Sequence, residues 1–196
     1  MNIQTFNKVF KAALFAAPKN DTRYYLCGVL LDVNEADTTC IVSTDGHRLL
    51  KVELKDTIDL PYGQYILPRE YVESVLRALS PKAKDDYSVN FDADENGSFT
   101  ISTHNGRWET RPVDATYPDY GRIVPSLDKQ DAMVCEVVMN PNYLIDAMKS
   151  AALLGSKVPT VTLRTNDNNS PMRFDITLGS SLDIESACMV VMPGRS

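Results

Sequence analysis

The sequence has few of the residues from which metal sites and redox sites are built. Its 196 residues include two histidines, His47 and His104, and no HExxH or HxH spacing occurs. The four cysteines are widely spaced and form no CxxC pair, which excludes the usual zinc and thioredoxin-like patterns. No glycine-rich phosphate loop of the Walker or Rossmann type is present either. We therefore expect no metal, no cofactor and no catalytic site.

Long apolar runs and an excess of positive charge are also missing. The longest apolar runs, such as AALFAA at 12–17, are far shorter than the ~20 residues that a membrane-spanning helix needs. The first residues, MNIQTFNKVF, lack the basic and apolar regions of a secretory signal, so we expect a reduced, cytoplasmic protein. The formal net charge of −6 and the pI of about 4.9 argue against a broad basic surface for nucleic acid.

Three segments have the apolar spacing of amphipathic helices. Apolar residues recur at intervals of three and four over 3–17, 68–79 and 141–152, and Asn140 and Pro141 suit the start of the third helix. Between the helices, stretches such as TTCIVSTD and SFTISTH are rich in β-branched residues and predict antiparallel strands. The sequence thus predicts an α+β chain in which a helix followed by several strands occurs three times. Helices between hairpins are also common in any α+β protein, which leaves coincidence open.

Positive charge is concentrated on the predicted helices. Residues 2–19 carry a net +3, residues 67–84 a net +2 and residues 140–157 a net +1, so the rest of the chain carries −12. An acidic protein whose helices face a polyanion would show this division. Helices whose charged faces are simply solvated would show it as well, and charge alone does not separate the two interpretations.

The segment STDGHRLLKVEL, at 43–54, brings Asp45, His47 and Arg48 close together directly after a predicted strand. A catalytic site would need a general base, a general acid or a set of metal ligands close enough to act together. Titratable residues that are merely close in sequence are weak support for catalysis. The structural alternative is a turn between two strands, in which Asp45 bonds to backbone groups and Gly46 adopts positive φ. We favour the turn.

Four segments resemble a known family in their order and spacing. DTRYYLCGVLLDV, STDGHRLLKVEL, YPDYGRIVP and CMVVMPGRS are similar to the second domain and the C-terminus of the bacterial replicative sliding clamp, the β subunit of DNA polymerase III. The resemblance implies the α+β DNA clamp fold, with residues 1–125 as a complete clamp domain and residues 130–196 as the last half of another. The family's first domain and the first half of its third have no counterpart. Asp119 and Tyr120 are expected to be structural.

The resemblance also implies a function. Such clamps are rings that encircle double-stranded DNA without sequence preference, line the hole with helices, and hold polymerase and clamp-loader proteins through short peptide motifs bound in a surface cleft. The chain would then be a non-catalytic processivity factor, and its short length suggests a phage-encoded version. Enclosure needs only weak attraction to phosphates. The alternative is a non-encircling adaptor or decoy that competes with a host clamp. Family rings contain twelve half-domain units, so three units per chain predict a homotetramer.

The resemblance assigns residues to two surfaces. An apolar cleft floor with polar edges suits the Leu or Phe anchors of a peptide, although Val190 to Met192 alone also fit an ordinary buried strand. Gly194 and Ser196 replace bulky apolar residues of the family, which puts the depth of the cleft in question. The predicted cleft residues are Leu26, Thr44, Gly46, His47, Arg48, Leu49, Pro118, Arg122, Ile123, Val190, Val191, Met192, Pro193 and Arg195. The predicted DNA-facing residues are Lys8, Lys11, Arg69, Arg77, Lys82 and Lys149.

Overall fold

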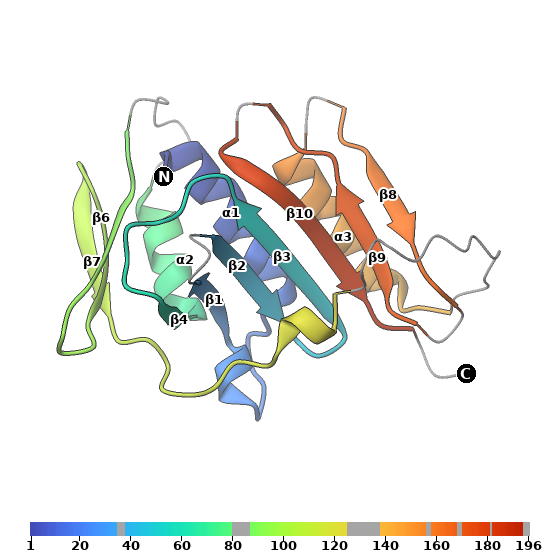
Figure 1. The fold of residues 1–196 in the computed structure, drawn as a ribbon, viewed down its shortest axis with the longest axis horizontal. Helices are drawn as coiled ribbons and strands as arrows, with labels where there is room; N and C mark the ends of the chain where they lie inside the picture. Colours follow the sequence, from blue (N-terminus) through green and yellow to red (C-terminus); the bar gives the residue numbers. More distant parts are fainter. Residues whose placement is uncertain are drawn as a thin grey trace.

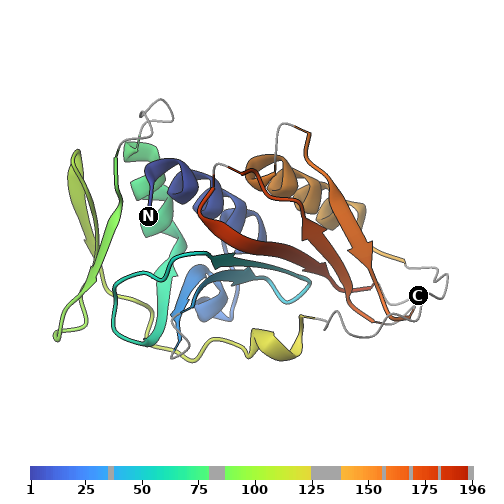
Figure 2. The same cartoon turned by 45° about the horizontal axis from the view of Figure 1, so that its top comes forward.

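The chain folds into a layer of strands with three helices on one side of it (Figure 1). Figure 2 shows the same layers from another angle, with the segment that ends at residue 124 running along the opposite side of the long strands. The α+β class expected from the sequence is confirmed. The computed structural model describes residues 1–34, 38–79, 87–124, 138–155, 158–167, 170–180 and 182–193.

Ten described strands form two antiparallel sheets. The main sheet has seven strands in the order β4-β1-β2-β3-β10-β9-β8, and a second sheet has three in the order β5-β6-β7. The strands are β1 Gly28–Val33, β2 Thr39–Thr44, β3 Arg48–Leu54, β4 Gly63–Pro68, β5 Asn90–Ala93, β6 Phe99–Thr103, β7 Gly106–Thr110, β8 Val161–Arg164, β9 Met172–Ile176 and β10 Ile184–Val191.

The helices begin where the sequence places start signals. Asn2 caps the first helix, because its side-chain oxygen accepts a hydrogen bond from the N–H of Thr5 at 2.7 Å. Asn140 caps the third helix in a similar way, and Pro141 occupies the first turn, as predicted. The helices are α1 Ile3–Ala16, α2 Arg69–Ala78 and α3 Pro141–Leu154.

The three predicted units are present, but they do not follow one another in space. The unit of α1 and β1–β4 lies in the middle, with α2 and β5–β7 at one end and α3 and β8–β10 at the other (Figure 1). The junction with the third unit is the antiparallel pairing of β10 with β3, and α3 packs beside α1. Residues after 138 therefore continue the sheet of the first unit. The predicted domain division between 125 and 130 lies outside the described residues and stays a prediction.

Two apolar clusters hold the layers together. The larger cluster lies between the helices and the sheets, and Phe6, Phe10, Phe99 and Phe174 are its largest fully buried members. The smaller cluster, which we call the outer cluster, lies on the helix-free side of the main sheet. There, Leu30 and other strand residues pack with Tyr117 and with the rest of the segment that runs to residue 124. The main sheet is therefore covered on both sides.

Arg69, at the start of α2, closes the C-terminal end of α1. Its guanidinium donates hydrogen bonds to the carbonyl oxygens of Leu14 and Ala17 and pairs with Glu73 at 2.8 Å. The last carbonyls of a helix have no partner within the helix, so these contacts satisfy them. The side chain is mostly buried between the two helices. Arg69 is therefore engaged in the fold, and its predicted role in facing DNA stays a prediction.

Replacing Arg69 with alanine should lower the free energy of unfolding by about 1–3 kcal/mol, because two partly buried carbonyls lose their donor. Arg77→Ala is the matched control on the same helix: it removes an exposed side chain and should change stability by less than about 0.5 kcal/mol. Urea unfolding followed by circular dichroism measures both values. Equal effects of the two substitutions would mean that the Arg69 contacts do not stabilise the junction of α1 and α2.

Candidate functional site

The turn between β2 and β3 is held together by its own side chains. The carboxylate of Asp45 accepts hydrogen bonds from the N–H groups of His47 and Arg48, at 2.9 and 3.0 Å. Thr44 Oγ1 accepts one from the N–H of Gly46 at 3.0 Å and donates one to the carbonyl of Arg48 at 2.8 Å. Gly46 has a φ of +84°, which favours glycine. The turn that the sequence predicts is confirmed, and it occupies the polar atoms of Thr44 and Asp45.

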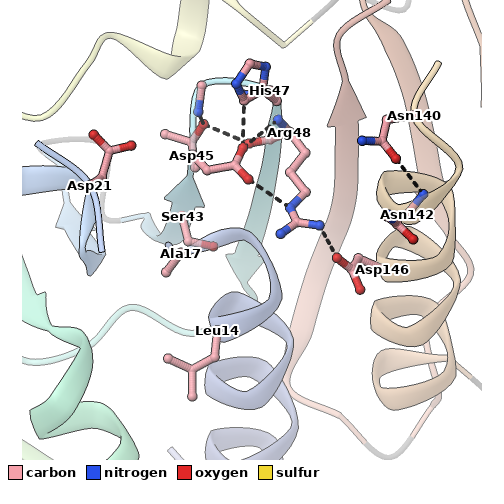
Figure 3. A network of polar contacts seen from close by, with 12 residues as sticks. Leu14, Ala17, Asp21, Ser43, Asp45, His47, Arg48, Asn140, Asn142 and Asp146 are labelled. Carbon is pink, nitrogen blue, oxygen red and sulfur yellow. Dashed lines mark hydrogen bonds and ion pairs between the residues drawn. The ribbon is translucent and has the colours of Figure 1, made fainter. Parts of the chain in front are cut away.

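Arg48 links this turn to helix α3, as Figure 3 shows. Its guanidinium pairs with Asp45 at 3.2 Å and with Asp146 of α3. It also lies 5.0 Å from the centre of the Tyr143 ring, on which the imidazole of His47 stacks. Both side chains of the Arg48–Asp146 pair are less than a fifth exposed. Removing one partner would leave the other charge poorly solvated, so the pair favours a single position of α3 relative to the turn.

These contacts are those of an anchored turn rather than of a reacting group. The carboxylate of Asp45 is used by two backbone N–H groups and by Arg48, and the imidazole of His47 stacks on the ring of Tyr143. No three His, Cys, Asp or Glu side chains gather as a metal-binding group in the described part of the chain. Of the helices described, none is long and apolar enough to cross a membrane.

Tyr143 and Asp146 are the site residues that sequence reasoning missed. Asp146 is 98 positions away from its partner Arg48, and only the pairing of β10 with β3 brings α3 beside the turn. Local spacing carries no trace of such a contact. The one available signal was that Asp146 is the only acidic residue of α3.

The predicted apolar cleft residues come together on the helix-free side of the main sheet. Leu26, Leu49, Ile123 and Val190 all belong to the outer cluster, although four separate segments supply them. Val190 lies opposite Leu49 in the pairing of β10 with β3. Leu26, Leu49 and Val190 are fully buried with Tyr117, whereas Ile123 is half-buried. The first three therefore form a closed base, and a ligand can reach only the residues at its rim.

The C-terminal residues form one side of that rim. The N–H of Met192 donates a hydrogen bond to the carbonyl of His47 at 2.8 Å, which brings the end of β10 beside the β2–β3 turn. Met192 and Pro193 are half-buried, and Val191 is buried within the sheet. Arg195 lies outside the described residues.

The segment after Tyr117 forms the other side. The hydroxyl of Tyr120 donates a hydrogen bond to Asp32 of β1 at 2.8 Å, and burial raises the pKa of this tyrosine. Asp119 caps a short 3₁₀ helix and pairs with Arg122 at 2.8 Å. The structural roles expected for Asp119 and Tyr120 are confirmed. Pro118 is half-buried, and the Arg122 side chain is 87% exposed.

A cavity of about 460 Å³ lies away from these residues. It is bounded by the N-terminal residues, the segment after β3 and strand β5, and it includes none of the predicted cleft residues. The carboxylates of Asp56, Asp59 and Asp183 contribute to its lining. The outer cluster has the residue types expected of the cleft, so we centre the candidate site on the outer cluster.

The predicted DNA-facing cations on the helices lie on the helix side of the sheets. Lys8 and Lys11 belong to α1, and Arg77 belongs to α2. None of these three has an acidic partner among the described residues. Lys149 of α3 is about half exposed and lies 3.5 Å from Asp146. Lys82 is outside the described residues.

Comparison with known sequences identifies the family. The profile of the DNA polymerase III beta subunit, central domain, matches residues 1–119. The beta sliding clamp of Escherichia coli K12 is 31% identical over 168 residues, which cover 84% of this chain and 42% of that clamp. The beta sliding clamp of Chlamydia muridarum is 24% identical over 196 residues, which cover 100% of this chain and 48% of that clamp. The chain spans less than half the length of these curated relatives.

Solved structures show the same fold. The DNA polymerase sliding clamp from Pseudomonas aeruginosa matches with a TM-score of 0.78 at 22% identity, covering 100% of this chain and 65% of that one. The beta subunit from the DNA polymerase of Streptococcus pyogenes matches with a TM-score of 0.74 at 17% identity, covering 100% and 65%. The chain thus has the clamp fold expected from its sequence, and it belongs to the family of the DNA polymerase III beta subunit, the bacterial sliding clamp.

Proposed function

We propose that the chain is a subunit of a DNA sliding clamp, a homotetrameric ring that encircles double-stranded DNA and moves along it. The observation that carries the proposal is the position of all three helices on one side of the sheets, with Lys8, Lys11 and Arg77 unpaired there among the described residues. In the ring this side faces the hole, and the helices meet the phosphates. The sheets form the outer wall.

The charges on the other side of the sheets support this orientation. Lys51, Arg122, Arg164 and Arg173 are each paired with a carboxylate. The net charge of the chain is −6, so the field outside the helix side is acidic. A polyanion is then attracted to the helices and repelled by the rest of the surface.

Weak attraction is sufficient for a ring that holds DNA by enclosing it. Each phosphate contact makes binding more dependent on salt, and many strong contacts would oppose movement along the duplex. The small number of unpaired cations on the described helices is consistent with that requirement.

We propose further that polymerase and clamp-loader proteins bind at the outer cluster through short linear peptides. The accessible rim consists of Pro118, Ile123, Met192 and Pro193, and His47 and Arg122 supply exposed polar groups at its edges. Burying one Leu or Phe anchor against such a surface contributes about 1.5–3 kcal/mol. The chain itself is then non-catalytic, and the chemistry belongs to its cytoplasmic partners.

A non-encircling adaptor or decoy is the second candidate. The observation in its favour is that the residues of the outer cluster come together within one chain, so peptide binding there needs no closed ring. Such a protein would bind partner peptides but would have no topological hold on DNA.

Retention on circular DNA tests the ring. The loaded protein should stay on nicked circular plasmid during gel filtration and should be lost after the plasmid is linearised, because a ring can slide off free ends. Equal retention on both forms would contradict encirclement. Peptide binding without retention on either form would favour the decoy.

Combining Lys8→Glu, Lys11→Glu and Arg77→Glu should reduce retention on circular DNA at low salt by about tenfold or more, and the difference should shrink as salt rises. Arg164→Glu is the control, because this side chain points to the helix-free side and pairs with Asp175 there. The same plasmid assay measures both variants. Wild-type retention of the triple variant would show that these helices do not face the duplex.

Charges placed on the rim should abolish peptide binding without unfolding the chain. Ile123→Glu and Met192→Glu alter half-buried side chains, and each should weaken binding of a fluorescent peptide with adjacent Leu and Phe anchors by tenfold or more. Val190 is unsuitable for this test, because it is fully buried in β10. Leu163→Glu introduces the same charge on the opposite side of the sheet and should leave affinity unchanged. Unchanged affinity in folded rim variants would refute the site.

A further inference from the structure

The third unit exposes more large apolar side chains than the rest of the described chain. Nine such side chains are exposed, and six of them lie between residues 138 and 163. The other three are Tyr24, Tyr62 and Tyr87, whose hydroxyl groups are compatible with water. Exposed aliphatic side chains gathered on one unit usually mark an interaction surface. The six are Val138, Leu144, Ile145, Met148, Val158 and Leu163.

On α3, two of these residues lie on the flank that faces away from α1. Successive residues of an α-helix are turned by about 100°, so Leu144 and Met148 share one flank, while Asp146 and Lys149 lie near the opposite one. Two contacts show that the flank with Asp146 and Lys149 faces α1 and the β2–β3 turn. Asp146 pairs with Arg48 of that turn, and the Lys149 ammonium lies 5.9 Å from the ring centre of Phe15 on α1. Leu144 and Met148 therefore point toward the open end of the molecule, where β8 is the last strand (Figure 1).

The helix side of β8 continues this apolar surface. Leu163 lies opposite Phe174 of β9, a member of the larger core, so its side chain is on the helix side of the sheet. Val161 shares that side and packs against the core, whereas Leu163 is 52% exposed. Arg164 points to the other side, where it pairs with Asp175 at 3.1 Å. We call the surface formed by Leu144, Met148, Val161 and Leu163 the α3–β8 face.

The opposite end of the molecule has no matching surface. None of the exposed large hydrophobic side chains in the described residues belongs to α2 or to β5–β7. Helix α2 instead exposes Glu70 and Arg77. A head-to-tail contact between copies would therefore place the α3–β8 face against charged groups, which is unfavourable. The α3–β8 face itself carries no charge, so two copies of it can meet without repulsion between like charges.

We propose that the α3–β8 face binds the same face of a second copy of this chain around a two-fold axis. The contact is isologous, because the same patch is used on both copies. The contact covers Leu144, Met148 and Leu163 of each copy. It also gives α3 a neighbouring helix on each flank, in the same way that α1 lies between α2 and α3. The role of the contact in a ring rests on the proposed function: two such contacts alternate with two contacts between the opposite ends.

The molar mass in solution tests the contact. The wild-type chain, Met148→Glu and Leu163→Glu are compared by light scattering after gel filtration at micromolar concentration. Each substitution places a charge in the contact and should halve the mass, from tetramer to dimer, or from dimer to monomer if the opposite ends do not associate at that concentration. Thr162→Glu, on the same strand but the other side, should keep the wild-type mass. A wild-type monomer, or an unchanged mass in both variants, would overturn the proposal.

Cross-linking gives an answer even if a charged variant does not fold. A two-fold axis brings equal positions close together, so Met148→Cys treated with a short bis-maleimide should form a covalent dimer well above the wild-type background. Thr162→Cys should not. A Met148→Cys yield at background would also overturn the contact. The plasmid assay separates this result from the ring: association through the α3–β8 face without retention on circular DNA would keep the contact and reject the proposed function.

Discussion

The pairing of β10 with β3 is the constraint on which the rest of the structure depends. It extends four strands of the first unit to a sheet of seven, and its register places Val190 opposite Leu49 and Val191 opposite Arg48. A slip of one residue would turn Val190 to the helix side and open the outer cluster. The base of the candidate peptide site, the position of Met192 beside the β2–β3 turn and the packing of α3 on α1 all follow from this one register.

A polar contact makes the same junction specific. Arg48 lies between Asp45 of the turn and Asp146 of α3, over the ring of Tyr143. A mostly buried ion pair adds little net stability, but breaking it is costly, so it disfavours other positions of the helix. The cations on the sheets are largely paired in this way, whereas Lys8, Lys11 and Arg77 have no acidic partner among the described residues. This division gives the molecule an electrostatically distinct helix side, on which the proposed enclosure of DNA depends.

Local patterns predicted much of the fold. The caps at Asn140 and Pro141, the three helix periods and the Asp45–Gly46 turn depend on neighbouring residues, and the structure confirms them. Strand β1 begins only at Gly28, because the N–H groups of Leu26 and Cys27 bond back to carbonyls at 23 and 24 in a 3₁₀ helix. Local spacing does not encode contacts between residues that are far apart in the sequence. Such contacts determine the placement of the first unit between the other two and the roles of Tyr143 and Asp146. Arg69 carries a charge like that of Arg77, but only the structure shows that it binds the end of α1.

The claim that the C-terminal unit is part of one continuous sheet can be tested most directly by amide hydrogen exchange of the intact chain. Amides of β10 that face β3 lie inside a seven-stranded sheet, so they should exchange as slowly as those of β2 and should lose protection together with them as urea is added. Fast exchange across β10 and β9 while β1 and β2 stay protected would contradict the account, because the third unit would then be separate from the first.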